Sequence, residues 1–499
     1  MKYLKLKVLI TIAGLAFSIG CSDFLNEDLQ GTYSNSTFYK TAEHALLATN
    51  ACYEPLAFKS VENNIWVFGD VASDDAVKGG NPGDQSEISF IENFDTNPDN
   101  GFVLAIWERY YNGISRTNEV IAKVPGIDMD ETLKKQYIAE AKFLRAYYYF
   151  QLVNIFGEIP LKTEPVETAS DLNVSLSSVS VVYGQIETDL LSAKNDLPIN
   201  ISNGNLGRAS KGAAFGLLAK AYLYSENYEE AIAYVDSLQA LSIYGLMDVY
   251  KQNFMVAYEN NIESIFEIQH LTDQDPFQGS AMNQWFAPAV ENGYYFDVPR
   301  QDFIDEFEVT TGGVVDPRLD YTVGRAGESW INGESFDPQW SPTGYLQKKH
   351  LQPLAEIEKK SKGNGDLNYT YMRYSDILLI KAEALNESNR TSEALIPLNE
   401  VRRRARESYL FDEDLTGHGS IPANLLPEIN DNSKSAVRLA IMHERRVELG
   451  FEFHRYFDLV RYGKAKAESA LSYTNFNFDT KRYFPIPQSE LDINLNINY

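Results

Sequence analysis

A pattern of small and apolar residues that occurs twice constrains the fold of this chain more than any other feature. In the first copy, Ala219 and Ala231 stand where two antiparallel helices would approach most closely, and larger apolar residues surround them. The second copy lies 163 residues later and again has alanine at both positions, Ala382 and Ala394. This spacing is that of a tetratricopeptide repeat. We therefore expect a mostly α-helical fold of stacked helix pairs rather than two unrelated amphipathic hairpins.

Hydrophobic periodicity predicts further helices on both sides of the repeat. The periodic segments are Val103–Val124, Leu133–Phe156, Val181–Leu197, Ser210–Ser225, Arg373–Asn386, Ser392–Arg406, Ser435–Leu449 and Glu452–Lys464. The stretch 260–362 is different, because it is rich in Gly, Pro, Asp and aromatic residues and has a β-like run at Ile262–Gln269. This composition predicts a long excursion of loops and short strands.

The N-terminus has the pattern of a secretory signal. Three lysines within the first seven residues precede an apolar run, Val8–Ile19, that is too short to span a bilayer as a mature helix. The run leads directly to Cys21 and resembles a bacterial lipobox, although serine stands at position 18, where leucine is usual. We predict a signal peptide at residues 1–20 and a lipidated Cys21; an ordinary signal peptide beside an unmodified cysteine is the alternative. Cys52 then has no disulfide partner, and its helical surroundings predict a small core thiol.

The charge balance argues against one large class of partner. Lys and Arg number 44 and Asp and Glu number 70, which gives a net charge of −26. Such a surface repels phosphate backbones, so we expect no nucleic-acid partner. Two Cys and six His are too few for a disulfide framework or a typical His/Cys metal centre. Aromatic residues are unusually abundant instead, at 13% of the chain.

The sequence matches two known catalytic motifs only in part. His443-Glu444 begins like a zinc-protease motif, but Val447 occupies the second ligand position. Gly207 and Gly212 have the spacing of a phosphate-binding loop, yet alanines follow where Lys and Ser or Thr would hold phosphate and Mg²⁺. We therefore predict no catalytic residue, no metal and no cofactor. Carboxylate pairs are so numerous in this acidic chain that glycosidase-type acid–base chemistry stays open.

Three glutamates fall four residues apart on one predicted helical face: Glu444, Glu448 and Glu452. Such a stripe repels itself unless cations face it. The candidate cations are Arg402, Arg404, Arg445 and Arg455. We prefer an inter-helix charge network that fixes helix register, and an acidic ligand cleft is the alternative.

Short stretches along the mature chain match a known pattern in its usual order. They are Cys21–Leu25, Ala139–Tyr147, Phe156–Leu161, Tyr371–Leu379, Ala382–Asn386, Leu398–Ala405, Glu444–Leu449, Arg455–Leu459 and Phe484–Leu491. Together they resemble the SusD/RagB family of bacterial outer-membrane nutrient-binding lipoproteins. These are scaffold motifs, and none of them names a ligand.

The resemblance implies a SusD-like α-helical fold in which four tetratricopeptide-like helix pairs carry the loop-rich region. The mature domain, residues 21–499, would comprise an N-terminal half (21–240), a ligand-binding excursion (260–362) and a C-terminal helical half (370–499). It implies a non-enzymatic lipoprotein, lipid-anchored in the outer membrane and exposed at the cell surface. Such a protein captures oligo- or polysaccharide and delivers it to a SusC-like TonB-dependent transporter. The alternatives are a surface glycoside hydrolase of a polysaccharide-utilisation system and a peptide-capturing RagB-like lipoprotein.

Two loop segments combine the residue types that bind sugars. Flat aromatic rings pack on the C–H faces of sugar rings, and polar side chains at the rim bind the hydroxyls. One segment is 66–81, and the other lies within the excursion. The candidate glycan-binding residues are Trp66, Asp74, Asp75, Lys78, Asn81, Trp285, Tyr294, Tyr295, Trp330 and Trp340. For any single ring, packing in the core is at least as good an interpretation.

Overall fold

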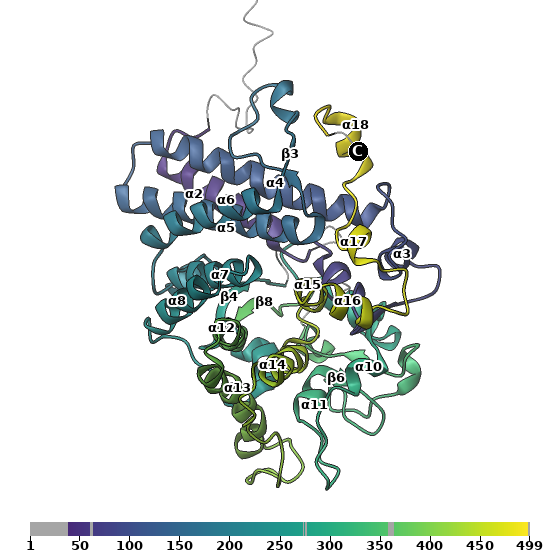
Figure 1. Ribbon diagram of the computed structural model, residues 1–499. Helices are drawn as coiled ribbons and strands as arrows, with labels where there is room; N and C mark the ends of the chain where they lie inside the picture. The colour runs from purple at the N-terminus through teal and green to yellow at the C-terminus, as the bar shows by residue number, and fades with distance from the viewer. Residues whose placement is uncertain (1–37, 60–62, 273, 275–276, 358–363, 498–499) are drawn as a thin grey trace, which may run out of the picture.

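Long helices dominate the structure, a computed structural model that describes residues 38–59, 63–272, 274, 277–357 and 364–497 (Figure 1). The N-terminal layer consists of α2 (Ala42–Tyr53), α4 (Gly101–Lys123), α5 (Glu131–Phe156) and α6 (Val179–Asp196). Next come α7 (Lys211–Tyr224), α8 (Tyr228–Gln239), α12 (Tyr374–Glu387), α13 (Thr391–Phe411) and α14 (Lys434–Leu449). All the predicted helices but the last are confirmed. The last is shorter than predicted: Phe451 and Phe453 adopt positive φ angles of 61° and 68°, so helix α15 (Arg455–Arg461) begins only after them.

Side-chain caps fix where the long helices begin. The Oδ1 atom of Asn100 accepts hydrogen bonds from the first backbone N–H groups of α4, at 3.0 and 3.3 Å. Asp130 caps α5 in the same way at 2.9 Å, and Ser210 caps α7 at 3.0 Å. Each bond satisfies a donor that the helix itself leaves unpaired.

The two copies of the repeat form packed helix pairs, α7 with α8 and α12 with α13, and α12 also packs against α7 and α8. Ala219, Ala231, Ala382 and Ala394 are all fully buried. The repeat assignment is therefore confirmed at its close-approach positions. The thiol of Cys52 is also buried and donates to the carbonyl oxygen of Ala48 at 3.3 Å, as expected for a core cysteine.

Four short antiparallel strand pairs accompany the helices within the described residues. The pairs are β1 (Ala76–Gly79) with β5 (Phe296–Pro299), β2 (Ile159–Pro160) with β3 (Leu176–Ser177), β4 (Ser264–Ile268) with β8 (Tyr369–Arg373), and β6 (Val323–Gly324) with β7 (Leu346–Gln347). The β1–β5 ribbon aligns Ala76 with Pro299 and Gly79 with Phe296, so it joins a segment near the N-terminus to the excursion.

Short helices complete the fold around these strands. They are α3 (Ser86–Glu92), α9 (Met282–Phe286), α10 (Gln301–Ile304), α11 (Arg318–Thr322), α16 (Lys464–Ala470), α17 (Phe478–Lys481) and α18 (Gln488–Ile493), together with a π-helical turn at Val67–Val71. Figure 1 shows the C-terminal segment, in yellow, running back beside the N-terminal helices. The backbone N–H of Phe484 donates to Ile155 at 2.9 Å, and that of Gln488 donates to Pro98 at 2.9 Å. Within the described ranges, no helix is long and apolar enough to cross a membrane.

Candidate functional site

The β1–β5 ribbon presents two tyrosines beside a polar loop at the surface. Tyr294, which is 36% exposed, accepts a hydrogen bond on its hydroxyl from Gln284 Nε2 at 2.8 Å. The hydroxyl of Tyr295 donates to Asn81 Oδ1 at 2.9 Å, and Asn81 Nδ2 donates to Asp84 Oδ2 at 3.0 Å. These five residues, Asn81, Asp84, Gln284, Tyr294 and Tyr295, are called the tyrosine shelf. They place partly exposed rings next to amide and carboxylate groups, which is the chemistry expected of a sugar-binding surface.

Lys78 closes the loop that carries Asn81. Its side chain is only 6% exposed, and its Nζ donates to the backbone oxygens of Asn81 at 3.2 Å and Asp84 at 2.5 Å. Burial lowers the pKa of Lys78, although the charges of Asp84 and Glu92 oppose this shift. Lys78 therefore points into the protein and shapes the loop, whereas the sequence suggested a direct contact with glycan.

Two glycines allow the loop to approach the tyrosines closely. Gly79 and Gly80 have φ angles of 68° and 65°, which favour glycine. A Cβ atom on Gly79 would lie 2.3 Å from the backbone oxygen of Tyr295, and one on Gly80 would lie 2.4 Å from the ring of Phe296. The contact between the loop and β5 thus depends on the absence of side chains at both positions.

The tryptophans of the two candidate segments lie behind the shelf rather than on it. Trp66 and Trp285 are 3% and 4% exposed, and their ring centroids are 6.1 Å apart. Trp66 stacks on Phe296 at 6.0 Å, and Phe296 contacts Tyr294 at the same centroid distance. These two tryptophans therefore form a buried aromatic wall that supports the shelf, consistent with the core-packing interpretation.

Trp330 and Trp340 form a separate cluster joined to the loop before β5. Trp330 is buried against Trp340 and Phe336, with centroid distances of 5.9 and 5.5 Å. Its indole N–H donates to Glu291 Oε1 at 2.8 Å. Trp340 is only partly buried, so of the candidate tryptophans it keeps the most exposed ring. Through Trp330 this cluster is joined to Glu291, which lies three residues before Tyr294 in the chain.

Asp74 and Asp75 are engaged by the C-terminal helices. Asp74 accepts two hydrogen bonds from Arg455, at 2.7 and 2.9 Å, and Asp75 Oδ1 accepts one from Arg446 at 2.7 Å. Both carboxyl groups are buried. Burial opposes ionisation of Asp74, but the charge of Arg455 outweighs it and lowers the pKa of Asp74. These aspartates therefore hold the segment before β1 on helices α14 and α15, and their carboxylates are occupied by arginines.

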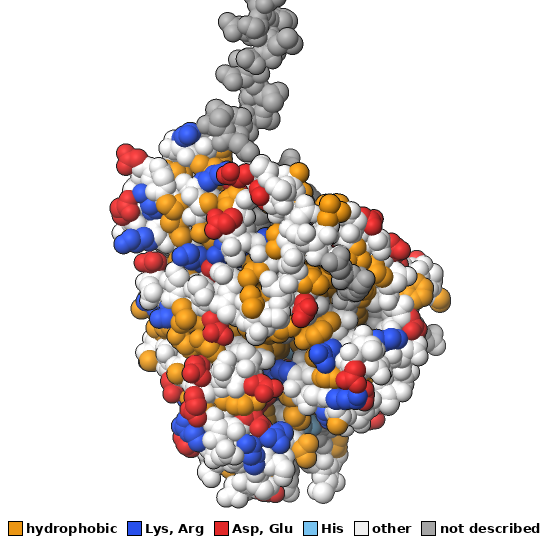
Figure 2. Space-filling view, turned by 45° about the horizontal axis from the view of Figure 1, so that its top comes forward, with side chains coloured by type: hydrophobic (Ala, Val, Ile, Leu, Met, Phe, Trp, Pro, Cys, Tyr) orange, Lys and Arg blue, Asp and Glu red, His pale blue; other side chains and the backbone are white. Residues whose placement is uncertain are grey.

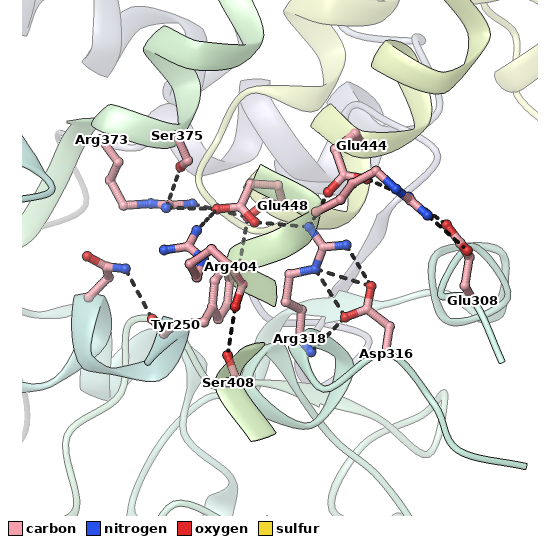
Figure 3. A network of polar contacts seen from close by, with 12 residues as sticks. Tyr250, Glu308, Asp316, Arg318, Arg373, Ser375, Arg404, Ser408, Glu444 and Glu448 are labelled. Carbon is pink, nitrogen blue, oxygen red and sulfur yellow. Dashed lines mark hydrogen bonds and ion pairs between the residues drawn. The ribbon is translucent and has the colours of Figure 1, made fainter. Parts of the chain in front are cut away.

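The glutamate stripe forms a buried charge network, which confirms the structural interpretation over the acidic cleft (Figure 3). Glu448 lies among three guanidinium groups: Arg404 at 2.5 Å, Arg318 at 3.0 Å and Arg373 at 3.0 Å. These charges lower the pKa of Glu448 to about 2 although the group is fully buried. Because every partner is charged and hydrogen-bonded, removing one would leave an uncompensated buried ion.

The cations of this network differ in part from the predicted ones. Arg402 binds Glu444 at 2.9 Å and Arg404 binds Glu448, as expected. Arg445 and Arg455 instead bind aspartates, Arg445 through Asp376 at 2.8 Å and Arg455 through Asp74. The remaining partners are Arg318, Arg373 and Lys349. They come from the excursion and from β8, and local helix spacing gives no indication of contacts so distant in the sequence.

Two hollows lie away from the shelf. One, of about 610 Å³, is lined by Phe94, Thr96, Phe156, Glu158, Leu176, Thr480, Lys481, Tyr483, Phe484, Pro485 and Ile486. The other, of about 460 Å³, is lined by Asn50, Tyr53, Glu54, Leu56, Ala57, Lys59, Gly204, Asn205, Leu206, Gly207, Arg208, Ile268, Gln269 and Gln278. Neither includes a predicted glycan-binding residue.

Sequence reasoning missed Gln284, Asp84 and Glu291. Gln284 precedes Trp285. The residue type of Trp285 indicated a sugar contact, but its side chain is buried. Asp84 ends a Gly-Asn-Pro-Gly turn that could have suggested an exposed loop. Among the described residues, no group of three or more His, Cys, Asp or Glu side chains is arranged to hold a metal ion.

The fold is thus that of a helical-repeat protein that carries partly exposed tyrosines and polar side chains on its loops. A sequence profile described as the SusD family matches residues 262–498, and one described as starch-binding associating with outer membrane matches residues 34–223. A solved laminarin-binding SusD-like protein is 30% identical, with 91% of this chain and 98% of that one covered and a TM-score of 0.75. The chain belongs to the SusD family.

Further relatives support this assignment. A SusD-like protein of Formosa agariphila is 28% identical, covering 89% of this chain and 88% of its own length. A SusD-like carbohydrate-binding protein from Bacteroides fragilis shares the fold, with 24% identity, a TM-score of 0.80, and coverage of 93% of this chain and 100% of its own. The chain is therefore a SusD-like surface glycan-binding protein of an outer-membrane-associated family. It is a binding protein and not a glycoside hydrolase.

Proposed function

We propose that this protein captures a glycan on the tyrosine shelf and delivers it to a SusC-like TonB-dependent transporter. A lipid on Cys21, which lies outside the described residues, would hold it at the outer surface of the outer membrane. In this proposal the halves 21–240 and 370–499 form the scaffold, and the excursion 260–362 supplies most of the binding surface. Family membership supports the role, and the shelf supplies its chemistry.

The observation that carries the proposal is the contact between Tyr295 and Asn81. It joins a partly exposed ring to an exposed amide, and Asp84 and Gln284 extend the polar set on either side. A sugar ring stacked on the tyrosines would find hydrogen-bonding groups for its hydroxyls within the same surface. Laminarin, a neutral β-glucan, is the first ligand to test because the 30% identical relative is named for binding it.

The test is calorimetric titration of Tyr294→Ala, Tyr295→Ala and Tyr295→Phe with laminarin and starch. Truncating a central aromatic at a binding surface commonly costs about 2 kcal/mol, roughly thirtyfold in affinity. We expect that loss for one or both alanine variants and a smaller loss for Tyr295→Phe, which keeps the ring but loses the hydrogen bond to Asn81. Tyr258→Ala is the matched control, because Tyr258 is 39% exposed and lies outside the shelf.

Wild-type affinity in both alanine variants, with thermal unfolding unchanged, would move the site away from the shelf. The partly exposed ring of Trp340 would then be the next position to test. Binding of peptides in preference to both glycans would favour the RagB-like alternative.

A further inference from the structure

The described cations in the segments that build the shelf and its tryptophan cluster all have partners within the protein. Segments 76–84, 281–300 and 325–349 contain five basic residues: Lys78, Arg300, Arg325, Lys348 and Lys349. Lys78 already donates to two backbone oxygens. Lys349 is buried and pairs with Glu452 at 2.7 Å within the charge network.

The other three cations also have partners. The guanidinium of Arg300 lies 3.8 Å from the ring centroid of Tyr473. Arg325 pairs with Asp320 at 2.6 Å and with Glu328 at 3.3 Å. Lys348 donates to the backbone oxygens of Asp320 and Ser329, both at 2.7 Å. Each of the five described cations in these segments therefore already has a partner within the protein.

Carboxylates, in contrast, face solvent in the same segments. Asp84 belongs to the shelf and is exposed, as are Glu334 and Asp337 near the tryptophan cluster. Glu291 is partly exposed and accepts the indole N–H of Trp330. The chain as a whole carries a charge of −26, and Figure 2 shows acidic and basic side chains interspersed over the face in view. The charged member of the shelf itself is thus a carboxylate, and a second one, Glu291, lies three residues before Tyr294 in the chain.

We infer that the tyrosine shelf selects uncharged glycans and rejects sulfated or uronate-rich ones by electrostatic repulsion. The inference rests on the proposed capture function and names the ligand class of that site. Stacking and hydrogen bonding hold a neutral chain without any counter-charge, whereas an anionic chain meets Asp84 and Glu291, and the one described cation on the loop of Asp84, Lys78, is buried. One pair of like charges about 4 Å apart in water costs roughly a factor of five in affinity, and a sulfated chain brings several.

The experiment compares laminarin with sulfated laminarin of the same chain length, by calorimetry with the full mature protein at low and at high salt. We expect laminarin to bind with little salt dependence and the sulfated chain to bind at least about tenfold more weakly at low salt. High salt should recover part of that loss, because ions screen repulsion between exposed charges. A sulfated chain that stays weak at every salt concentration would indicate a steric cause and overturn the electrostatic inference.

Charge variants supply the second measurement. Asp84→Asn keeps an oxygen that can accept from Asn81, and it should raise the affinity for sulfated laminarin relative to laminarin by several-fold at low salt. Glu230→Gln, an exposed change on α8, is the matched control and should leave that ratio unchanged. Equal or tighter binding of the sulfated chain by wild type would overturn the inference while leaving glycan capture intact. Binding of neither chain, nor of starch, would instead contradict the proposed function and this inference with it.

Discussion

Asp297 and Tyr295 stand two positions apart in the chain, yet one is buried and the other helps to form the surface. Asp297 has a φ angle of 57°, and neither carboxyl oxygen has a hydrogen-bond partner among the described residues. Burial raises the pKa of Asp297 well above its usual value, and the nearby charge of Asp75 raises it further. Burial and the charge of Asp297 raise the pKa of Asp70 in the same way. Asp297 therefore retains its proton to higher pH than an ordinary aspartic acid does.

Asp297→Asn should stabilise the protein increasingly as the pH rises above about 4. The unfolded chain releases the proton of Asp297 near its ordinary pKa, whereas the folded chain retains it to higher pH. Wild type therefore loses stability as pH rises between these two pKa values, by up to about 1.4 kcal/mol per pH unit, and the asparagine variant does not. Asparagine also tolerates a positive φ, so the change adds no backbone strain.

The measurement is the free energy of unfolding in denaturant for both proteins across the acid to neutral range. Asp196→Asn, at an exposed position of α6, is the control and should follow the wild-type profile. Parallel profiles for wild type and Asp297→Asn would mean that Asp297 ionises in the folded protein as it does in the unfolded chain.

At the scale of elements, small residues at the points of closest approach determine the spacing between the paired helices. Ala219 on α7 and Ala382 on α12 are fully buried, and the two helices pack on each other as well as on their own partners. A longer side chain at either position would have to push two packed helices apart, because protein interiors have few voids to receive it.

Ala219→Leu and Ala382→Leu should each destabilise the protein by about 1–3 kcal/mol through overpacking. Thermal and denaturant unfolding would measure the loss. The same change at Ala233, an exposed position of α8, is the matched control and should have little effect. If all three variants unfold like wild type, the repeat does not set the spacing of these helices.

The elements that sequence could predict are those with local signals. The helices follow from periodicity and caps, and the repeat follows from its alanines. The stripe at Glu444 and Glu448 was recognised as a structural network, but Arg318 and Arg373 were not named because their contacts span 126 and 75 residues. Sequence could not predict which of the candidate aromatic rings are exposed, for a similar reason. Residue type identified Trp285 and Tyr295 alike, and only the packing of Trp66, Phe296 and Trp285 decides which rings are buried.

At the scale of the whole molecule, N-terminal and C-terminal segments of the sequence are in direct contact. Asp74 is bound by Arg455, which lies 381 residues later, and Asp75 is bound by Arg446. The C-terminal segment also lies beside the N-terminal helices (Figure 1). The shelf is thus part of one domain whose scaffold comes from both halves of the chain.

Cys21→Ala should release this domain from the outer-membrane fraction without unfolding it. The reason is the signal-peptide pattern that ends at Cys21, where a lipid would provide the membrane anchor. Fractionation of cells that lack the transporter partner is the measurement, with Cys52→Ala as the control that should stay with the membrane. A Cys21→Ala protein that remains in the membrane fraction of such cells would contradict lipidation.

The long-range ion pairs also set the order in which the protein can fold. Closing loops of several hundred residues is entropically unfavourable, so contacts such as Asp74 with Arg455 form late. Before Arg446 and Arg455 have been synthesised, the two aspartates of the segment that leads into β1 lack their arginine partners. Burying their charges without those partners would be unfavourable. A growing chain therefore cannot place this segment, which leads into the shelf, until helices α14 and α15 are present. Completion of the shelf is thereby deferred until nearly the whole polypeptide has been synthesised.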